Sequence, residues 1–365
     1  MKSIVRITFL LIILYACSGK DDNIALEPIK KPELQNGKNI ILMIGDGMGL
    51  TQITGARTVN GGNLNILRCR SIGIQSTHAA DKYVTDSGAA ATAMACGEKA
   101  NFYSVGVDTA GNPLTSIVEI AEVNQLSTGL ITTSEITHAT PAAFFAHQTD
   151  RYNYEAIALE LVSKGVDFFL GGGWKYFNQR SDGLNLLDSL VKRDYQVKDN
   201  LAFVSGNQKA AVLISEGAPL TYLHGRGNVL PDAVTVAVSR LSQNKRGFFL
   251  MVEGAQIDWA GEDNDQDYLM AEMLDFDKAV GRALDFAEAD GNTLVVITGD
   301  HETGGYSLID GNLSNHTVQG QFLTWLHTGS MVPVFAFGPG EEEFTGVYEN
   351  TAFFYKFLEF FGLDQ

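Results

Sequence analysis

Runs of apolar residues of strand length alternate with longer amphipathic segments through most of this chain. In the longest of these segments the apolar residues recur every three or four positions, which is the spacing of one buried helix face. The residues with this spacing are Leu269, Met273, Phe276, Val280 and Leu284. Alternation of this kind predicts βαβ units and an α/β fold. We expect a single domain with a central, mainly parallel β-sheet flanked by helices on both faces.

The length of 365 residues suits one large α/β domain or two small ones, and no internal repeat or domain boundary is visible in the folded part. The expected strands are Asn39–Ile44, Ser71–Gln75, Thr128–Thr132, Val166–Leu170, Ala211–Ile214, Gly247–Val252, Thr293–Ile297 and Val332–Ala336. The expected helices are Leu114–Val123, Tyr154–Ser163, Pro231–Ser242, Gln266–Ala289 and Phe353–Phe361.

The first residues of the chain have the features of a targeting segment. Lys2 and Arg6 precede a short apolar run, and the stretch up to Cys17 resembles a bacterial lipobox. We expect a lipoprotein signal peptide at 1–16, lipid attachment to Cys17, a polar tether at 17–38 and a folded domain at 39–365. The protein would then be anchored to a bacterial membrane in the periplasm or at the cell surface. The alternative is an uncleaved membrane anchor, although the apolar run is short for that role.

The chain is acidic, with a formal net charge of −17. Cleavage before Cys17 would remove Lys2 and Arg6 and no acid, so the charge would fall from −17 to about −19. Such a surface argues against nucleic acid as a partner, and metal ions could neutralise part of the acid. Beyond Cys17 only Cys69 and Cys96 remain, and they form no CxxC pair. They therefore indicate neither a thiolate metal site nor an assignable disulfide.

Ser87 stands at the head of a run of glycine and alanine residues. We expect it to begin a helix, where free backbone N–H groups and the helix dipole favour a serine alkoxide or a bound phosphate. The alternative is purely structural: Asp86 or Ser87 caps a tightly packed helix. The segment alone does not decide between the two.

Chemically useful side chains follow several of the expected strands. Asp46 comes after the first strand, and Asp300 with His301 comes after Thr293–Ile297. The ends of parallel strands are where open α/β sheets bind ligands. Three further clusters hold candidate metal ligands: Glu253 and Asp258, His138 and Thr140, and His327. Mixed nitrogen and oxygen ligands suit zinc, and all-oxygen sets suit magnesium.

These segments together resemble the alkaline phosphatase family. The matching stretches occur in the family's order and span nearly the whole expected domain: Ile44–Gly49, Thr85–Ser87, Ile136–Ala143, Met251–Trp259, Thr298–His301 and His327–Gly329. The resemblance implies an alkaline phosphatase-like catalytic domain at 39–365. Its activity would be hydrolysis of small phosphate monoesters through a phosphoserine, with two Zn²⁺ ions and one Mg²⁺ ion as cofactors, and it allows for a homodimer.

The resemblance also implies a role for each site residue. Ser87 would be the nucleophile, and Arg151 would clamp two phosphate oxygens. Asp46, Asp300 and His301 would hold the zinc ion that activates the oxygen of Ser87.

The resemblance assigns Asp258 and His327 to the second zinc ion, while Asp46, Thr140 and Glu253 would bind magnesium. His138 and Trp259 occupy positions beside the magnesium and phosphate sites that vary within the family.

One position departs from the family pattern. Glu262 stands four residues after Asp258, where members usually carry a histidine ligand of the second zinc ion. Glutamate can bind zinc, but its charge would make the metal a weaker Lewis acid. Because of Glu262, one alternative to a phosphomonoesterase is a phosphate-binding lipoprotein without turnover. A separate alternative is a phosphodiesterase or sulfatase of the same superfamily.

Overall fold

The computed structural model describes residues 38–206 and 208–363. The predicted signal peptide, Cys17 and the tether up to residue 37 therefore lie outside the described residues. All described residues belong to one compact unit. None of the helices in 38–206 and 208–363 has both the length and the hydrophobicity to cross a bilayer.

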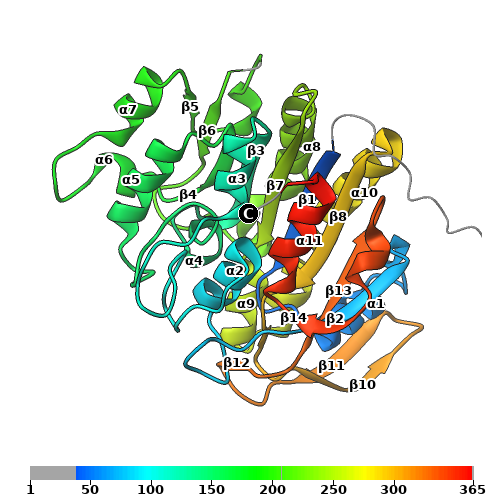
Figure 1. Cartoon of the computed structure of the whole chain (residues 1–365). Coiled ribbons are helices and arrows are strands. Elements are labelled where there is room, and N and C mark those ends of the chain that lie inside the picture. Colours follow the sequence, from blue (N-terminus) through cyan, green and yellow to red (C-terminus); the bar gives the residue numbers. More distant parts are fainter. Residues whose placement is uncertain (1–37, 207, 364–365) are drawn as a thin grey trace, which may run out of the picture. The chain divides into compact units, whose positions relative to one another are not determined.

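A ten-stranded sheet runs through this unit, in the order β14-β2-β13-β8-β1-β7-β3-β4-β6-β5 (Figure 1). Only β13 runs against its neighbours; every other pairing in this sheet is parallel. The strands are β1 Lys38–Gly45, β2 Ser71–Ser76, β3 Ser127–Glu135, β4 Phe168–Gly172, β5 Gln196–Lys198, β6 Ala210–Leu213, β7 Gly247–Gly254, β8 Thr293–Gly299, β13 Val332–Phe337 and β14 Gly346–Glu349. The predicted fold class is confirmed.

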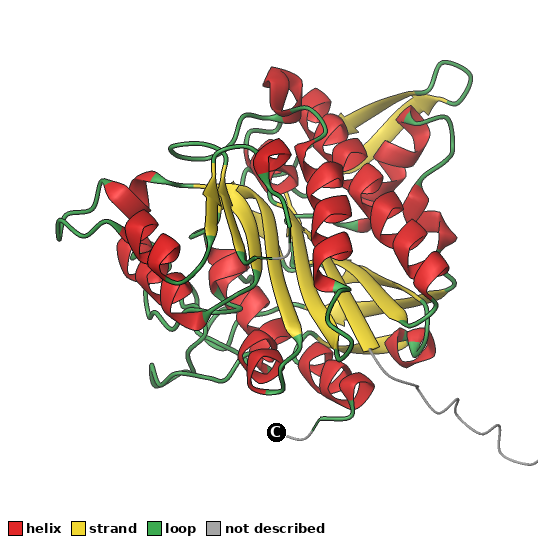
Figure 2. Ribbon diagram, turned by 90° about the horizontal axis from the view of Figure 1, so that it is seen from above, coloured by secondary structure: helices red, strands yellow, loops and turns green. Residues whose placement is uncertain are grey.

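Helices cover both faces of the sheet (Figure 2). One face packs against α1 Leu50–Val59, α8 Val229–Leu241, α9 Gln256–Glu262 and α10 Gln266–Asp290. The other packs against α2 Ser87–Cys96, α3 Ile117–Val123, α4 Ala139–Ala142, α5 Tyr154–Lys164, α6 Lys175–Asn178, α7 Leu186–Lys192 and α11 Ala352–Phe361. Within β1, Ile40 and Leu42 join one core and Ile41 and Met43 the other. A strand that is buried on both faces must be apolar at successive positions, which explains the unbroken runs in the sequence.

All the predicted strands are present, with shifts of up to three residues at their ends. Two corrections matter. The helix predicted from Leu114 begins at Ile117, because Ser116 and Glu119 form a reciprocal capping box there. Glu253 was expected after the strand that ends at Val252, but it lies inside β7. Its side chain therefore projects from the sheet itself.

Several short strands were not predicted. β5 has three half-buried residues, and β14 is a mostly exposed edge strand. The remaining strands lie outside the main sheet: a hairpin of β10 Ser307–Asn312 and β11 Thr317–Gln321, and a short pair of β9 Glu302–Thr303 with β12 His327–Thr328. None of these segments carries the apolar run of a buried strand. The β9–β12 pair nevertheless matters for the site, because it brings His327 beside His301.

Candidate active site

The site lies where β1 and β8 end. These strands are neighbours in the sheet, and Gly45 pairs with Gly299 across them. The next residues, Asp46 and Asp300, are therefore side by side, and both are fully buried. β7 borders β1 on its other side and adds Glu253. The sheet thus assembles three buried acids from distant parts of the chain.

Helix α2 begins at Ser87, as predicted, and Asp86 is its N-cap. The Asp86 carboxylate accepts hydrogen bonds from the N–H groups of Gly88 and Ala89, at 3.1 and 3.2 Å. The structural alternative is thus correct in that Asp86 caps the helix, and this cap uses two of the free N–H groups. The helix is fully buried, and a Cβ on Gly88 would lie 2.8 Å from the carbonyl of Ser104. Ser87 Oγ lies 3.4 Å from Nε2 of His301.

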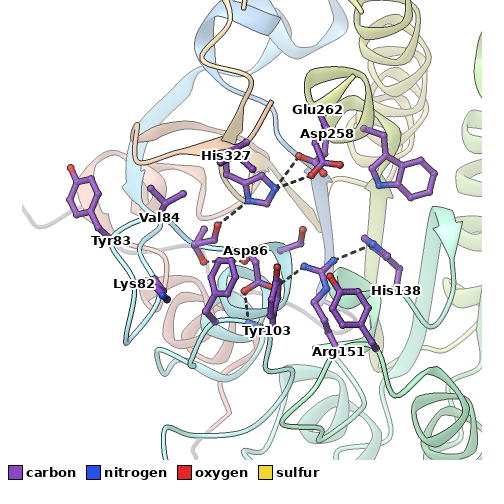
Figure 3. A pocket seen from close by; sticks show the side chains of 16 residues that line it. Lys82, Tyr83, Val84, Asp86, Tyr103, His138, Arg151, Asp258, Glu262 and His327 are labelled. Carbon is purple, nitrogen blue, oxygen red and sulfur yellow. Dashed lines mark hydrogen bonds and ion pairs between the residues drawn. The ribbon is translucent and has the colours of Figure 1, made fainter. Parts of the chain in front are cut away.

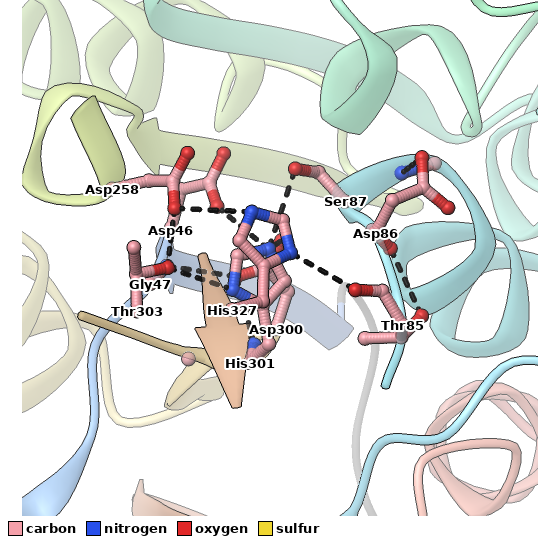
Figure 4. Close-up of polar contacts among 12 residues, drawn as sticks. Asp46, Gly47, Thr85, Asp86, Ser87, Asp258, Asp300, His301, Thr303 and His327 are labelled. Atoms are coloured by element: carbon pink, nitrogen blue, oxygen red, sulfur yellow. Dashed lines mark hydrogen bonds and ion pairs between the residues drawn. The ribbon is translucent and has the colours of Figure 1, made fainter. Parts of the chain in front are cut away.

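The first group of candidate metal ligands is Asp46, Asp300 and His301 (Figure 4). Nε2 of His301 lies 3.3 Å from Asp46 and 3.4 Å from Asp300. Backbone N–H groups bond one oxygen of Asp300, whereas its other oxygen and both oxygens of Asp46 accept no hydrogen bond from any described residue. Buried carboxylate oxygens without partners are costly. A cation at this point would satisfy them, so the residues fit a metal ion.

The second group joins Asp258, His301 and His327. The two imidazole rings stack with centroids 3.6 Å apart, and Nε2 of His327 lies 3.4 Å from Asp258. Nδ1 of His327 lies 2.9 Å from the carbonyl oxygen of Thr85, to which it can only donate. This bond fixes the tautomer and leaves Nε2 free to bind a metal ion.

His301 is oriented in a comparable way. Its Nδ1 lies 3.2 Å from the hydroxyl of Thr303, which itself donates to Asp258. The hydroxyl oxygen is then the acceptor for Nδ1–H, so Nε2 of His301 also presents a lone pair to the carboxylates. Sequence reasoning did not find Thr303, because a threonine two residues after a histidine carries no distinctive signal.

Glu262 lies at the edge of the second group. It sits one turn after Asp258 on α9, and its carboxylate is 3.8 Å from Nε2 of His327. Its side chain is 46% exposed, whereas that of Asp258 is 6% exposed. The position thus allows Glu262 to approach a metal ion from the open side of the site. The nearby acid Asp265 is not available for this role, because it caps α10.

The third group consists of Asp46, Glu253 and His138. His138 is the N-cap residue of α4, and Thr140 lies inside that helix. Oε1 of Glu253 and Oγ1 of Thr140 are buried without hydrogen-bond partners among the described residues. Both were predicted magnesium ligands, and their unsatisfied oxygens fit that chemistry.

The crowding of acids shifts their pKa values. Burial, and then repulsion from Asp300 and Asp258, raises the pKa of Asp46 well above its usual value. Burial raises the pKa of Glu253 to about 7 and, with repulsion from Asp258, that of Glu262 also to about 7. Each shift reports that the ionised form lacks compensating positive charge.

Arg151 supplies the buried positive charge next to Ser87. Its Nη1 donates to Asp86 at 2.7 Å, and its Nη2 lies 3.2 Å from Nε2 of His138. Because arginine can only donate, His138 is the acceptor and stays neutral; burial and then Arg151 lower its pKa to about 3. Burial alone would lower the pKa of Arg151, but Asp86 outweighs it and raises that pKa. Asp86 was predicted only as a cap, yet it also holds Arg151 in place.

These groups open into a cavity of about 590 Å³ (Figure 3). Its lining includes Ser87, Arg151, Asp258, Glu262 and His327. The lining also includes Trp259, whose ring meets that of His138 edge to face at 5.9 Å. Aromatic residues at the mouth were not predicted: Tyr83, Phe102, Tyr103 and Tyr152.

Comparison with known proteins agrees with this architecture. A family model for alkaline phosphatase matches residues 37–321. The alkaline phosphatase of Escherichia fergusonii is 33% identical over 89% of this chain and 86% of its own length. The solved alkaline phosphatase of the Antarctic bacterium TAB5 superposes with a TM-score of 0.87 and 41% identity, covering 91% of this chain and 100% of that chain. The chain belongs to the alkaline phosphatase family.

Two other relatives are longer than this chain. Alkaline phosphatases 4 and 3 of Bacillus subtilis are 39% and 37% identical over 76% and 80% of this chain. The match spans 64% and 66% of their own lengths, a little under two thirds of each. A solved variant of the Antarctic enzyme, in which glutamate replaces a histidine, has magnesium bound in its M3 site.

Proposed function

We propose that this protein is a metal-dependent phosphomonoesterase that releases inorganic phosphate through a phosphoserine on Ser87. The observation that carries the proposal is the position of the Ser87 hydroxyl. It lies at the start of a buried helix, 3.4 Å from His301, on the cavity that Arg151 also lines. Relatives named alkaline phosphatase, at 30–39% identity, support the same activity.

We propose two zinc ions and one magnesium ion as the cofactors. The first two groups combine carboxylates with imidazole nitrogen, which suits zinc. Asp46, Thr140 and Glu253 offer only oxygen, which suits magnesium. His138 also belongs to this third group; its nitrogen would bind a metal ion only in place of its contact with Arg151, and should then weaken the preference for magnesium. The variant of the Antarctic enzyme that has magnesium bound in its M3 site supports magnesium as one of the cofactors.

The residues of the chain divide the work of the reaction. Arg151 would bind two phosphate oxygens and hold the phosphorus in line with Ser87 Oγ, and Asp86 fixes the guanidinium for this task. The Oγ–P bond forms as the bond from phosphorus to the alcohol oxygen breaks; the hydroxyl of Ser87 gives up its proton, and the leaving alcohol oxygen takes up one. Water then attacks the phosphoserine, the Oγ–P bond breaks, and phosphate is released. When bound, the metal ions supply Lewis acidity and lower the pKa of a coordinated hydroxyl.

Three substrates test the reaction class. Purified protein with added zinc and magnesium is assayed with p-nitrophenyl phosphate, bis-p-nitrophenyl phosphate and p-nitrophenyl sulfate. We expect preference for the monoester, because its non-bridging oxygens share two negative charges, whereas the diester and the sulfate each carry one, and Arg151 binds such oxygens through its charge. Preference for the diester or sulfate would replace the proposal with the corresponding activity. Phosphate binding without turnover of any of the three would indicate a binding protein.

We propose further that the protein is lipidated on Cys17, held at a bacterial membrane in the periplasm or at the cell surface, and able to form a homodimer. The lipobox and the polar tether support the anchor. Cys17→Ser should move the protein from the membrane fraction to the soluble fraction, with kcat/KM unchanged because the substitution alters no residue of the candidate site. A wild-type protein found soluble and cleaved at another position would contradict the anchor. Analytical ultracentrifugation tests the dimer.

A further inference from the structure

Tyr103 has an unusual backbone beside the phosphate site. Its φ angle is 69°, in the left-handed region that disfavours residues with a Cβ. Two hydrogen bonds hold the Tyr103 backbone there. Its N–H donates to the carboxylate of Asp86 at 3.0 Å, and its carbonyl oxygen accepts from the backbone N–H of Arg151 at 2.8 Å. The guanidinium of Arg151 is the proposed phosphate clamp, and Asp86 is the residue that orients it. Backbone strain retained at such a place indicates a function for the side chain that it positions.

The ring of Tyr103 belongs to an aromatic platform made of Phe102, Tyr103 and Tyr152. The Tyr103 ring lies 4.3 Å from that of Phe102 and 5.6 Å from that of Tyr152. The Tyr152 ring is itself 5.8 Å from the Cζ atom of Arg151. All three residues line the cavity, and Figure 3 shows Tyr103 next to Asp86 and Arg151. The platform therefore begins where the bound phosphate would end.

Two of these rings are not part of the hydrophobic core. Tyr103 is 44% exposed and Tyr152 is 54% exposed, although both are large and partly apolar. Exposed aromatic surface grouped at a cavity mouth is typical of a ligand site. Aromatic side chains bind planar ligand rings by stacking, and this stacking is tolerant of the ring's identity.

We propose that the aromatic platform binds the alcohol part of the substrate and favours phosphate monoesters whose alcohol carries a planar aromatic ring, as in nucleoside monophosphates. This inference rests on the proposed phosphomonoesterase activity. Arg151 holds the phosphate, and the rings of Tyr103 and Tyr152 receive the planar group. Selectivity then arises outside the reacting atoms, from contact that an ester without such a ring cannot make.

The test compares adenosine 5′-monophosphate with ribose 5-phosphate. Both release the same type of primary alcohol, so the ratio of their kcat/KM values reports the contribution of the base. We expect this ratio to be roughly tenfold in favour of the nucleotide, the effect of about one stacked ring. Tyr103→Asn removes the ring and suits the left-handed backbone, and it should bring the ratio close to one. Tyr103→Phe keeps the ring and should keep the ratio.

Further variants keep the proposal falsifiable. Tyr152→Leu removes a second ring from a different loop and should lower the ratio even if Tyr103→Asn folds poorly. Tyr83→Asn is the matched control, because Tyr83 is an 81% exposed tyrosine that lines the same cavity outside the platform. If the ratio falls in Tyr83→Asn and not in the platform variants, the platform is not the binding surface.

Two wild-type results separate this proposal from the one it rests on. No turnover of ribose 5-phosphate or p-nitrophenyl phosphate would overturn the phosphomonoesterase function itself. Turnover of both with a nucleotide ratio near one would overturn only the platform. If Tyr103→Asn leaves the ratio of kcat/KM values unchanged but lowers the sedimentation coefficient, the rings contact a second copy of the chain. That result would also overturn the platform proposal.

Discussion

Arg151→Ala should distinguish binding of a phosphate monoester from binding of any anion. Arg151 is 7% exposed, and its guanidinium has five N–H donors. Its contacts with Asp86 and His138 use two of them, and Nε has no partner among the described residues. Donors therefore remain for two phosphate oxygens while Asp86 keeps the group in place.

The magnitude follows from the loss of two charge-assisted hydrogen bonds. Each is worth about 1.5–3 kcal/mol, so kcat/KM for p-nitrophenyl phosphate should fall by roughly 10²–10⁴-fold. A diester carries one negative charge where a monoester dianion carries two. We therefore expect Arg151→Ala to lower kcat/KM for bis-p-nitrophenyl phosphate by a factor that is about tenfold smaller, or less still. The reason is that the diester has half the negative charge with which Arg151 can interact. Steady-state kinetics on both substrates measures the difference.

The chain offers a matched control in Arg226. It is also 7% exposed and pairs with two buried acids, Glu272 and Asp275, but it lies outside the cavity. Arg226→Ala should lower the melting temperature, because it leaves buried carboxylates unpaired, without changing kcat/KM of the folded protein. Equal losses for the monoester and the diester in Arg151→Ala would refute the assignment of Arg151 as a clamp for the monoester dianion.

Three further predictions concern the nucleophile and the metal ions. Ser87→Ala should abolish trapped phosphoserine and lower turnover by roughly 10³-fold or more; full activity, or label on another residue, would reject Ser87. Glu262→His should raise turnover several-fold for esters with poor leaving groups, because the metal ion near Asp258 and His327 then withdraws more charge; unchanged metal content and unchanged leaving-group dependence would place Glu262 outside the metal shell. Chelation should lower the melting temperature at pH 8 by roughly 5–10 °C, and by less at pH 5.

The sequence predicts the centre of this fold better than its edges. Strands such as β1 and β8 are apolar at successive positions because helices cover both of their faces, and that pattern is visible without a structure. Edge strands β5 and β14 are short and partly exposed, so their residues are not constrained to be apolar. Their pairing depends on neighbours that are distant in the sequence.

The candidate site divides in a similar way. Asp46 and Asp300 could be predicted, because a residue that follows a parallel strand has a known location. Arg151 lies in a loop, and only the family resemblance singled it out. The second role of Asp86 was hidden, since one carboxylate can cap a helix and bind an arginine together. The position of Tyr103 depends on a left-handed backbone angle, which the sequence does not show.

The effect of chelation on the melting temperature should depend on pH, because the buried acids near Ser87 titrate at unusually high pH. Burial, and then repulsion from Asp258, raises the pKa of Asp300 to about 6, and burial raises that of Glu253 to about 7. Carboxyl groups of the unfolded chain titrate near pH 4, so the folded, metal-free protein binds more protons than the unfolded chain between about pH 4 and 7.

The stability of the metal-free protein therefore falls as the pH rises from about 4 to 7, and it stays low at higher pH. Bound cations compensate the ionised acids and remove this loss, so the difference in melting temperature between metal-loaded and chelated protein should grow from pH 5 to pH 8. An equal difference at the two pH values would mean that these carboxylates are not neutralised by the metal ions.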